Sequence, residues 1–210
     1  ILDQLSSRVG DRTEEANRKV VAQCLADPAL LDEIAKGLTS RDAALVGDCA
    51  EVLTKVADER AELVAPYAEA LAALLTHKNT RARWEATHAL ALVARLSPKT
   101  IASSFLRLGE MIQGDSSTIV RNYAVTAVGN YAGTSAEAAE KAHPILEKAS
   151  TLWEGKQAAR ALDGLRNVVE VMPNLSAEIR ALAQDFRGDR RGVVRRAARS
   201  LIRATGGPEA

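Results

Sequence analysis

Small and apolar residues recur along most of this chain with a period of 37 or 38 residues. In each copy they stand three, one and three positions apart, which is the spacing of one buried face of an α-helix. The five copies are Cys49, Val52, Leu53 and Val56; Ala86, Ala89, Leu90 and Val93; Ala124, Ala127, Val128 and Tyr131; Ala161, Gly164, Leu165 and Val168; and Ala198, Leu201, Ile202 and Thr205. A repeat of this length is typical of stacked helical hairpins, so it constrains the fold strongly.

A second ladder of apolar residues lies between these stripes and has a period of 37 residues. Its rows are Leu31, Ala68, Phe105, Ala142 and Ile179; Ile34, Leu71, Leu108, Ile145 and Leu182; and Leu38, Leu75, Ile112, Ala149 and Phe186. Two independent ladders with one period indicate a repeating unit of two helices. We call the helix of the first stripe A and the helix of the second ladder B.

Turn-forming residues such as Pro98, Gly133 and Gly188 stand between the ladders, where helices have to end and restart. The predicted A helices lie near residues 13–25, 41–57, 79–96, 116–132, 155–171 and 190–205. The predicted B helices lie near residues 28–38, 61–76, 98–113, 135–152 and 174–187. No segment shows the alternating pattern of a β-strand.

A lone hairpin of this size buries too little apolar surface to offset the ordering of its chain, so neighbouring hairpins have to stack. We therefore expect one all-α repeat domain over residues 1–210. Its hairpins would span approximately 12–38, 41–76, 79–113, 116–152 and 155–187, followed by a capping helix at 190–205. Arg196 and Arg199 take positions that inner repeats fill mostly with small or apolar residues, which is typical of a final helix that faces water.

Several turns between repeats carry a recurring pair of polar residues six positions apart. The pairs are Asp115 with Arg121, Asp189 with Arg195 and, with His in place of Asp, His77 with Arg83. In this respect the sequence resembles the HEAT-repeat (armadillo-like) family over roughly residues 13–205. The resemblance implies a right-handed α-solenoid of about five and a half HEAT-like hairpins. It also implies that the three arginines tie turn to helix, and it carries no specific activity.

In HEAT-like solenoids the B helices usually line the concave face, so the resemblance places a partner there. Certain B-helix residues have a helical phase that points away from the apolar ladder: Glu69, Ser103, Arg107, Glu110, Glu147, Arg180 and Gln184. They mix both charges, as a protein-binding surface does.

The sequence contains no motif of a catalytic, phosphate-binding or metal site. Glu85 and Asp163 have no partner at a defined spacing, so we expect both carboxylates to face solvent. We therefore predict a non-enzymatic protein with no cofactor and no metal. Cys24 and Cys49 form no CxxC pair, and we expect two buried, reduced thiols in a cytoplasmic protein.

The chain has 28 Lys and Arg against 27 Asp and Glu, so any attraction to nucleic acid has to come from a local patch. Basic residues on the turns and the last helix define a possible basic rim: Arg41, Lys78, Arg81, Lys156, Arg190, Arg191, Arg196 and Arg199. Three interpretations stay open for this rim: incidental charge on a soluble cap, nucleic-acid binding, and binding to an acidic protein surface.

The leading hypothesis is a scaffold that binds a protein partner through the B-helix face. The alternative is a nucleic-acid-binding protein similar to the HEAT-like alkylpurine DNA glycosylases, for which Trp84 and Glu85 are a poor local match. A lyase or a chaperone for a cofactor-bearing protein is a third hypothesis. We expect a monomer or a weak homo-oligomer without a membrane segment, because no apolar run reaches the roughly 18 residues that cross a bilayer.

Overall fold

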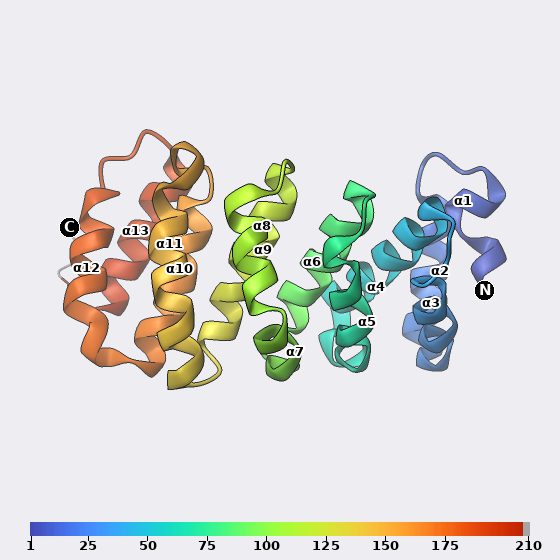
Figure 1. Ribbon diagram of the computed structural model, residues 1–210, viewed down its shortest axis with the longest axis horizontal. Helices are drawn as coiled ribbons and strands as arrows, with labels where there is room; N and C mark the ends of the chain where they lie inside the picture. The colour runs from blue at the N-terminus through green and yellow to red at the C-terminus, as the bar shows by residue number, and fades with distance from the viewer. Residues whose placement is uncertain (208–210) are drawn as a thin grey trace. The chain divides into compact units, whose positions relative to one another are not determined.

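The computed structural model of the chain describes residues 1–207, and within that range it contains helices and no strand (Figure 1). The α-helices are α1 (Ser6–Val9), α2 (Glu15–Ala26), α3 (Leu31–Gly37), α4 (Ala43–Val64), α5 (Ala68–Ala73), α6 (Thr80–Val93), α7 (Pro98–Ser103), α8 (Phe105–Gly114), α9 (Thr118–Ala132), α10 (Ala136–Gly155), α11 (Ala158–Val171), α12 (Ser176–Asp185) and α13 (Gly192–Ala204). Short 3-10 helices span Leu2–Gln4, Pro28–Leu30, Ala65–Tyr67, Leu74–Thr76 and Pro173–Leu175. In the described range, no helix is long and apolar enough to span a lipid bilayer.

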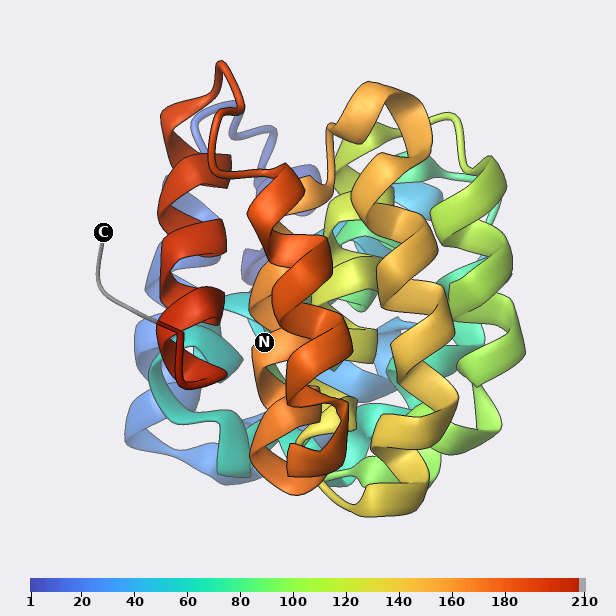
Figure 2. The ribbon, with the colours of Figure 1, turned by 90° about the vertical axis from the view of Figure 1, so that its left-hand side faces the viewer.

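The chain divides into two compact units, unit 1 (Ile1–Thr100) and unit 2 (Ile101–Ala210), and each is described by itself. The A helices are α2, α4 and α6 in unit 1 and α9, α11 and α13 in unit 2. The B helices are α3 and α5 in unit 1 and α8, α10 and α12 in unit 2, while α7 spans the boundary. Figure 2 shows α12 and α13 side by side at the end of unit 2 that faces the viewer. The single domain over residues 1–210 stays a prediction.

Every predicted helix has a counterpart, with three main differences in where helices break. The B helix expected over 61–76 is α-helical only at α5 and at the end of α4, and the 3-10 helices Ala65–Tyr67 and Leu74–Thr76 complete it. Helix α4 continues to Val64, but Arg60 has non-helical dihedral angles (φ −145°, ψ 77°), so the regular A helix ends close to its predicted end. The B helix expected over 98–113 is two helices, α7 and α8, because the backbone leaves the helical region at Ser104 (φ −93°, ψ 1°).

The two helix types begin differently. Pro28, Pro66, Pro98 and Pro173 stand in the first turns of B segments, where a residue without an N–H and with a fixed φ fits well. Several A helices begin instead with a polar N-cap whose side chain accepts backbone N–H groups: Asp42 for α4, Asn79 for α6 and Ser117 for α9.

The apolar ladders form the cores of the two units. Every residue of the five A-helix stripes is buried, as predicted. The second ladder is buried too, except that Phe105, Ile145, Leu182 and Phe186 are half-buried. Within each unit, neighbouring A helices pack closely along their lengths, whereas neighbouring B helices make little backbone contact. The A helices therefore supply most of the contact between successive hairpins.

The arginines of the recurring turn pairs bind the turn backbone, as the resemblance implied. Arg83 donates to the carbonyl of His77 at 2.8 Å, Arg121 donates to that of Asp115, and Arg195 donates to that of Asp189 at 2.7 Å. The residue six positions earlier also accepts an N–H two residues on, through Asp189 Oδ1 (2.7 Å) or through His77 Nδ1 (3.1 Å). Histidine can therefore replace aspartate here, because only an acceptor is required.

The last residues of α10, from Leu152 on, form a non-helical turn that lacks this acceptor, since Leu152 takes its place. Here Trp153, Glu154 and Gly155 all have positive φ, at 54°, 58° and 68°. Such left-handed backbone costs roughly 1–2 kcal/mol for each non-glycine residue. Arg191 offsets part of that cost, because its guanidinium donates to the carbonyl of Gly155 at 2.6 Å.

Candidate functional site

Three charged side chains meet among the A helices of unit 1. Asp48 and Glu51 stand one turn apart on α4 and are 1% and 4% exposed. Arg81, at the start of α6, places its guanidinium 2.9 Å from Asp48 Oδ1 and forms a second ion pair with Glu51. Asn17 of α2 donates to both carboxylates, at 3.1 Å and 3.0 Å. This charged cluster links all three A helices of unit 1.

The charged cluster has two carboxylates for one guanidinium, so it is formally negative. Burial alone would raise the pKa of Asp48, but hydrogen bonds from Ser7 and Asn17 and the charge of Arg81 lower it overall. Asp48 therefore stays ionised at neutral pH, although water is excluded from it.

A groove of about 410 Å³ opens beside Glu51, between α2 and α4. Its apolar lining consists of Val21, Ala22 and Leu25. Its charged lining consists of the carboxylates of Glu14, Glu51, Asp58 and Glu59 and the cations of Arg18 and Lys55. Glu51 is already paired with Arg81, which leaves three carboxylates against two cations beside the apolar residues. This lining suits a side chain with a long hydrocarbon stem and a positive end, which is lysine or arginine.

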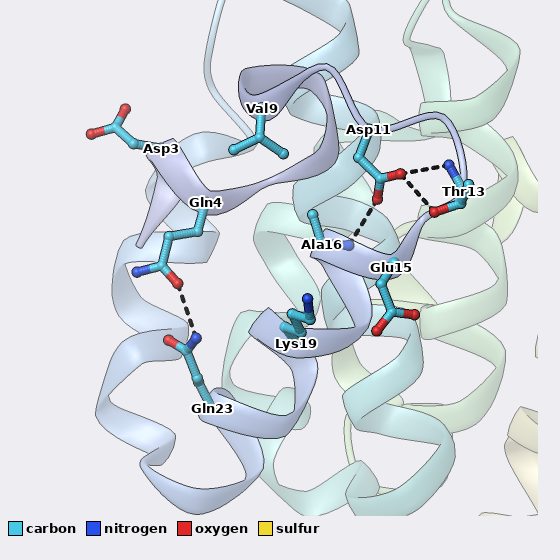
Figure 3. A pocket seen from close by; sticks show the side chains of 9 residues that line it. All are labelled: Asp3, Gln4, Val9, Asp11, Thr13, Glu15, Ala16, Lys19 and Gln23. Carbon is cyan, nitrogen blue, oxygen red and sulfur yellow. Dashed lines mark hydrogen bonds between the residues drawn. The ribbon is translucent and has the colours of Figure 1, made fainter.

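A second hollow, of about 530 Å³, lies at the N-terminal end of α2 (Figure 3). Asp11 lines it, but its carboxylate already accepts N–H groups from Ala16 (2.8 Å) and Thr13 (2.7 Å), which hold its pKa well below the usual range. Gln4 and Gln23 are hydrogen-bonded to each other at 2.9 Å. Because these polar groups bind one another, the hollow offers less to a ligand than the groove does.

Glu85 does not face solvent, contrary to expectation. It is 7% exposed, and its carboxylate accepts a hydrogen bond from Trp84 Nε1 at 2.6 Å. Burial raises the pKa of Glu85. The reason is packing: the Glu85 carbonyl oxygen lies 2.9 Å from the hydroxyl of Thr54, so α4 covers this face of α6. Trp84 is half-buried.

The residues predicted for the B-helix face lie on B segments, and none is buried. The exposed ones are Glu69, Ser103, Glu110, Glu147 and Gln184, and the half-buried ones are Arg107 and Arg180. Arg107 pairs with Glu110 on α8, at 3.1 Å. Glu69 belongs to unit 1 and the other six to unit 2. Binding of a partner by this face stays a prediction.

Two members of the predicted basic rim are committed to contacts within the chain. Arg81 belongs to the charged cluster, and Arg191 makes a two-point contact with Asp189, at 2.9 and 2.6 Å. The other six residues are exposed: Arg41, Lys78, Lys156, Arg190, Arg196 and Arg199. The charge available to an anion is therefore smaller than the sequence suggests.

The two cysteines are buried and not joined in a disulfide, as expected. Burial raises the pKa of Cys24 to about 11 and that of Cys49 to about 12. Both thiols are therefore protonated at neutral pH, which makes them poor nucleophiles.

The charged cluster and the groove are not predicted by any sequence pattern described above. The one usable signal is that Asp48 and Glu51 directly flank Cys49 and Val52 of an apolar stripe. Carboxylates so close to a buried face need a cation, and Arg81 stands 30 residues after Glu51, near one repeat length. Without knowledge of which helices cover α4, this signal is indistinguishable from ordinary surface charge.

No protein-family model matches the sequence, and no curated protein matches it. Solved structures do share the fold. An engineered protein is similar with a TM-score of 0.75 and 20% identity, over 98% of this chain and 96% of its own. A designed armadillo repeat protein in complex with the peptide (KR)4 gives a TM-score of 0.75 at 17% identity, over 97% of each chain. The complex of CpcE and CpcF of phycocyanin lyase from Nostoc sp. PCC7120 gives 0.58 at 20% identity, over 83% of this chain and 99% of that chain. The chain therefore has the all-α, armadillo-like helical-repeat fold that the sequence predicts.

Proposed function

We propose that this chain is a non-enzymatic repeat scaffold that binds a protein partner, and that the groove between α2 and α4 takes a basic side chain of that partner. The observation that carries the proposal is the groove itself, in which the carboxylates of Glu14, Asp58 and Glu59 outnumber the cations of Arg18 and Lys55 beside three apolar residues. A designed armadillo protein of the same fold is described in complex with the basic peptide (KR)4, which supports a peptide as the ligand class.

The physical basis is the match between the groove and a lysine or arginine side chain. The hydrocarbon stem would cover Val21 and Leu25, while the cation would lie near Asp58 and Glu59. The close packing of α4 against α6 holds the α4 side of the groove in place before binding, which lowers the entropy lost on association.

The proposal is tested by fluorescence anisotropy with a labelled Lys-Arg octapeptide, titrated with the full chain. Glu59→Lys reverses one charge of the groove, and we expect it to weaken binding by about fivefold or more. Glu69→Lys is the matched control, because it reverses an exposed glutamate of the same unit on a B helix. Circular dichroism confirms that both variants fold.

The outcomes separate the two faces. Loss of affinity in Glu59→Lys alone supports the groove, whereas loss in Glu69→Lys alone supports the B-helix face. Equal binding by both variants and the wild type, or no binding at low salt, contradicts a basic ligand in unit 1. For the B-helix face of unit 2, we expect the double variant Arg107→Glu, Arg180→Glu to fold and to lose only a partner held there.

The nucleic-acid alternative stays a prediction and depends on the six exposed residues of the basic rim. Duplex binding through phosphates would fall steeply as salt is raised. An absence of duplex binding at low salt removes this alternative. The cytoplasmic location and the oligomeric state also stay predictions.

A further inference from the structure

One histidine and two glutamates converge on the B-helix side of unit 2. His143 and Glu147 stand one turn apart on α10, so they share a face of that helix. Glu178 comes from the next B helix, α12. One ligand atom from each of the three residues lies within 4.8 Å of the other two, and His143 Nε2 is 3.9 Å from Glu178 Oε1.

We infer that these three side chains form a binding site for a divalent transition-metal ion such as Zn²⁺. An imidazole nitrogen and two carboxylate oxygens are a ligand set that Zn²⁺ accepts, at about 2.0–2.2 Å from the ion. Ligands at that distance around a tetrahedral centre lie about 3.3–3.6 Å apart. Binding therefore requires the ligand atoms to move closer than their present separations, and the two glutamate side chains that would move are exposed. Three protein ligands leave the fourth position for water or for a group of a partner.

The surroundings favour such an ion. The imidazole of His143 is 14% exposed, so one ligand is held by packing while the glutamates can adjust. Two lysines of α10 are engaged elsewhere: Lys141 with Glu137 at 2.7 Å, and Lys148 with Gln113 at 3.1 Å. Helices α10 and α12 make little backbone contact, so an ion bridging them would join the B helices of two successive hairpins.

The inference is tested with the tag-free full chain and Zn²⁺ by isothermal titration calorimetry. We expect one ion per chain and a rise in the unfolding temperature with Zn²⁺. His143→Gln and Glu178→Gln should each lower the affinity at least about tenfold, since even loss of an outer-shell partner commonly costs that much. Asp185→Asn is the matched control, because it removes one exposed carboxylate from α12 outside the cluster, and it should bind Zn²⁺ like the wild type.

Substitution of Co²⁺ for Zn²⁺ allows binding to be measured by absorption spectroscopy, independently of calorimetry. A visible absorption band of Co²⁺ should be present in the wild type and absent in Glu178→Gln, whose substituted residue is exposed and does not threaten folding. Failure of the wild type to bind Zn²⁺ overturns the inference. Equal binding by the wild type, His143→Gln and Glu178→Gln overturns it too, because the ion would then lie elsewhere.

Discussion

Two A-helix interfaces, α4 with α6 in unit 1 and α9 with α11 in unit 2, are built with different chemistry. The first contains buried charge: Asp48 and Glu51 face Arg81, and Glu85 lies nearby. The second contains almost none and depends on the contact of Gly129 with Gly164, where a Cβ on Gly129 would be 2.8 Å from the neighbouring Cα. One repeat period thus accommodates two solutions. The stability of variants at the first interface should depend on pH, whereas that of variants at the second should depend on added side-chain volume.

The largest effect is expected for Arg81→Ala, which removes the cation of the first interface. Asp48 and Glu51 would be left buried without a counter-charge, and the free energy of unfolding should fall by about 3 kcal/mol. The pKa of Asp48 is lowered in the folded state, so its contribution to stability is present above 3.8 and is lost as the pH falls below that value. The difference between variant and wild type should therefore shrink on acidification.

Urea unfolding at pH 7 and at pH 3 measures both parts of this prediction. Arg41→Ala is the control, because Arg41 is an exposed basic residue of the turn before α4, and its loss should change the free energy of unfolding by less than about 0.5 kcal/mol. An equal loss in the two variants would mean that the buried ion pairs do not stabilise unit 1.

The next effect is expected for Gly164→Ala in the second interface. Its Cβ would lie 2.9 Å from Gly129 Cα and 2.9 Å from a methyl group of Leu146. We expect a loss of about 2 kcal/mol through overpacking, even though alanine is the better helix former. The loss should be the same at pH 7 and pH 3, in contrast to the loss in Arg81→Ala.

Gly109→Ala is the matched control for this variant, because its Cβ would meet only Ile145 Cδ1, at an ordinary 3.5 Å. It should leave the thermal unfolding temperature unchanged or raise it. If Gly164→Ala behaved in the same way, the two A helices would have room to separate, and the contrast between the interfaces would disappear.

The smallest effect is expected for Glu85→Gln, and it should be a gain. Burial raises the folded pKa of Glu85 above its ordinary 4.5, so the wild type loses stability as the pH rises from 4.5 through the folded value. Glutamine keeps an acceptor for Trp84 Nε1 and has no charge to bury. We expect a gain in the free energy of unfolding at pH 7 that vanishes near pH 4.

Denaturant titrations at the two pH values check the sign of this effect. Glu110→Gln, an exposed residue of α8, should show no such dependence beyond the loss of its ion pair with Arg107. A destabilised Glu85→Gln at pH 7 would show that the carboxylate is needed in its ionised form.

The fold was predictable because its main determinant is local. Periodic stripes such as Ala86 to Val93 report which face of one helix is covered, and proline and N-cap residues report where helices begin. The charged cluster depends on α2, α4 and α6 together, and no spacing within one helix reveals that Arg81 reaches Asp48. The prediction that Glu85 faces solvent was wrong for the same reason, since α4 also covers a face of α6 that lies outside the apolar stripe of α6.

The break at Ser104 and the left-handed turn at Trp153 were not predictable for a different reason. No glycine or proline marks the break at Ser104, and Gly155 marks only the last of the three left-handed residues of the turn. Only part of the metal-ligand cluster could be predicted from the sequence. His143 and Glu147 have a visible helical spacing, but Glu178 joins them only through the packing of two hairpins.

The left-handed turn has a consequence for how this chain acquires its structure. The carbonyl of Gly155 is bound by Arg191, which comes 36 residues later. The Trp153 ring nitrogen, in turn, donates to the carbonyl of Ile112 in the hairpin before it, at 3.1 Å. During synthesis this turn therefore gains its contact with Arg191 only after the start of α13 has emerged. A turn between two hairpins of unit 2 thus depends on a residue that follows the second of them.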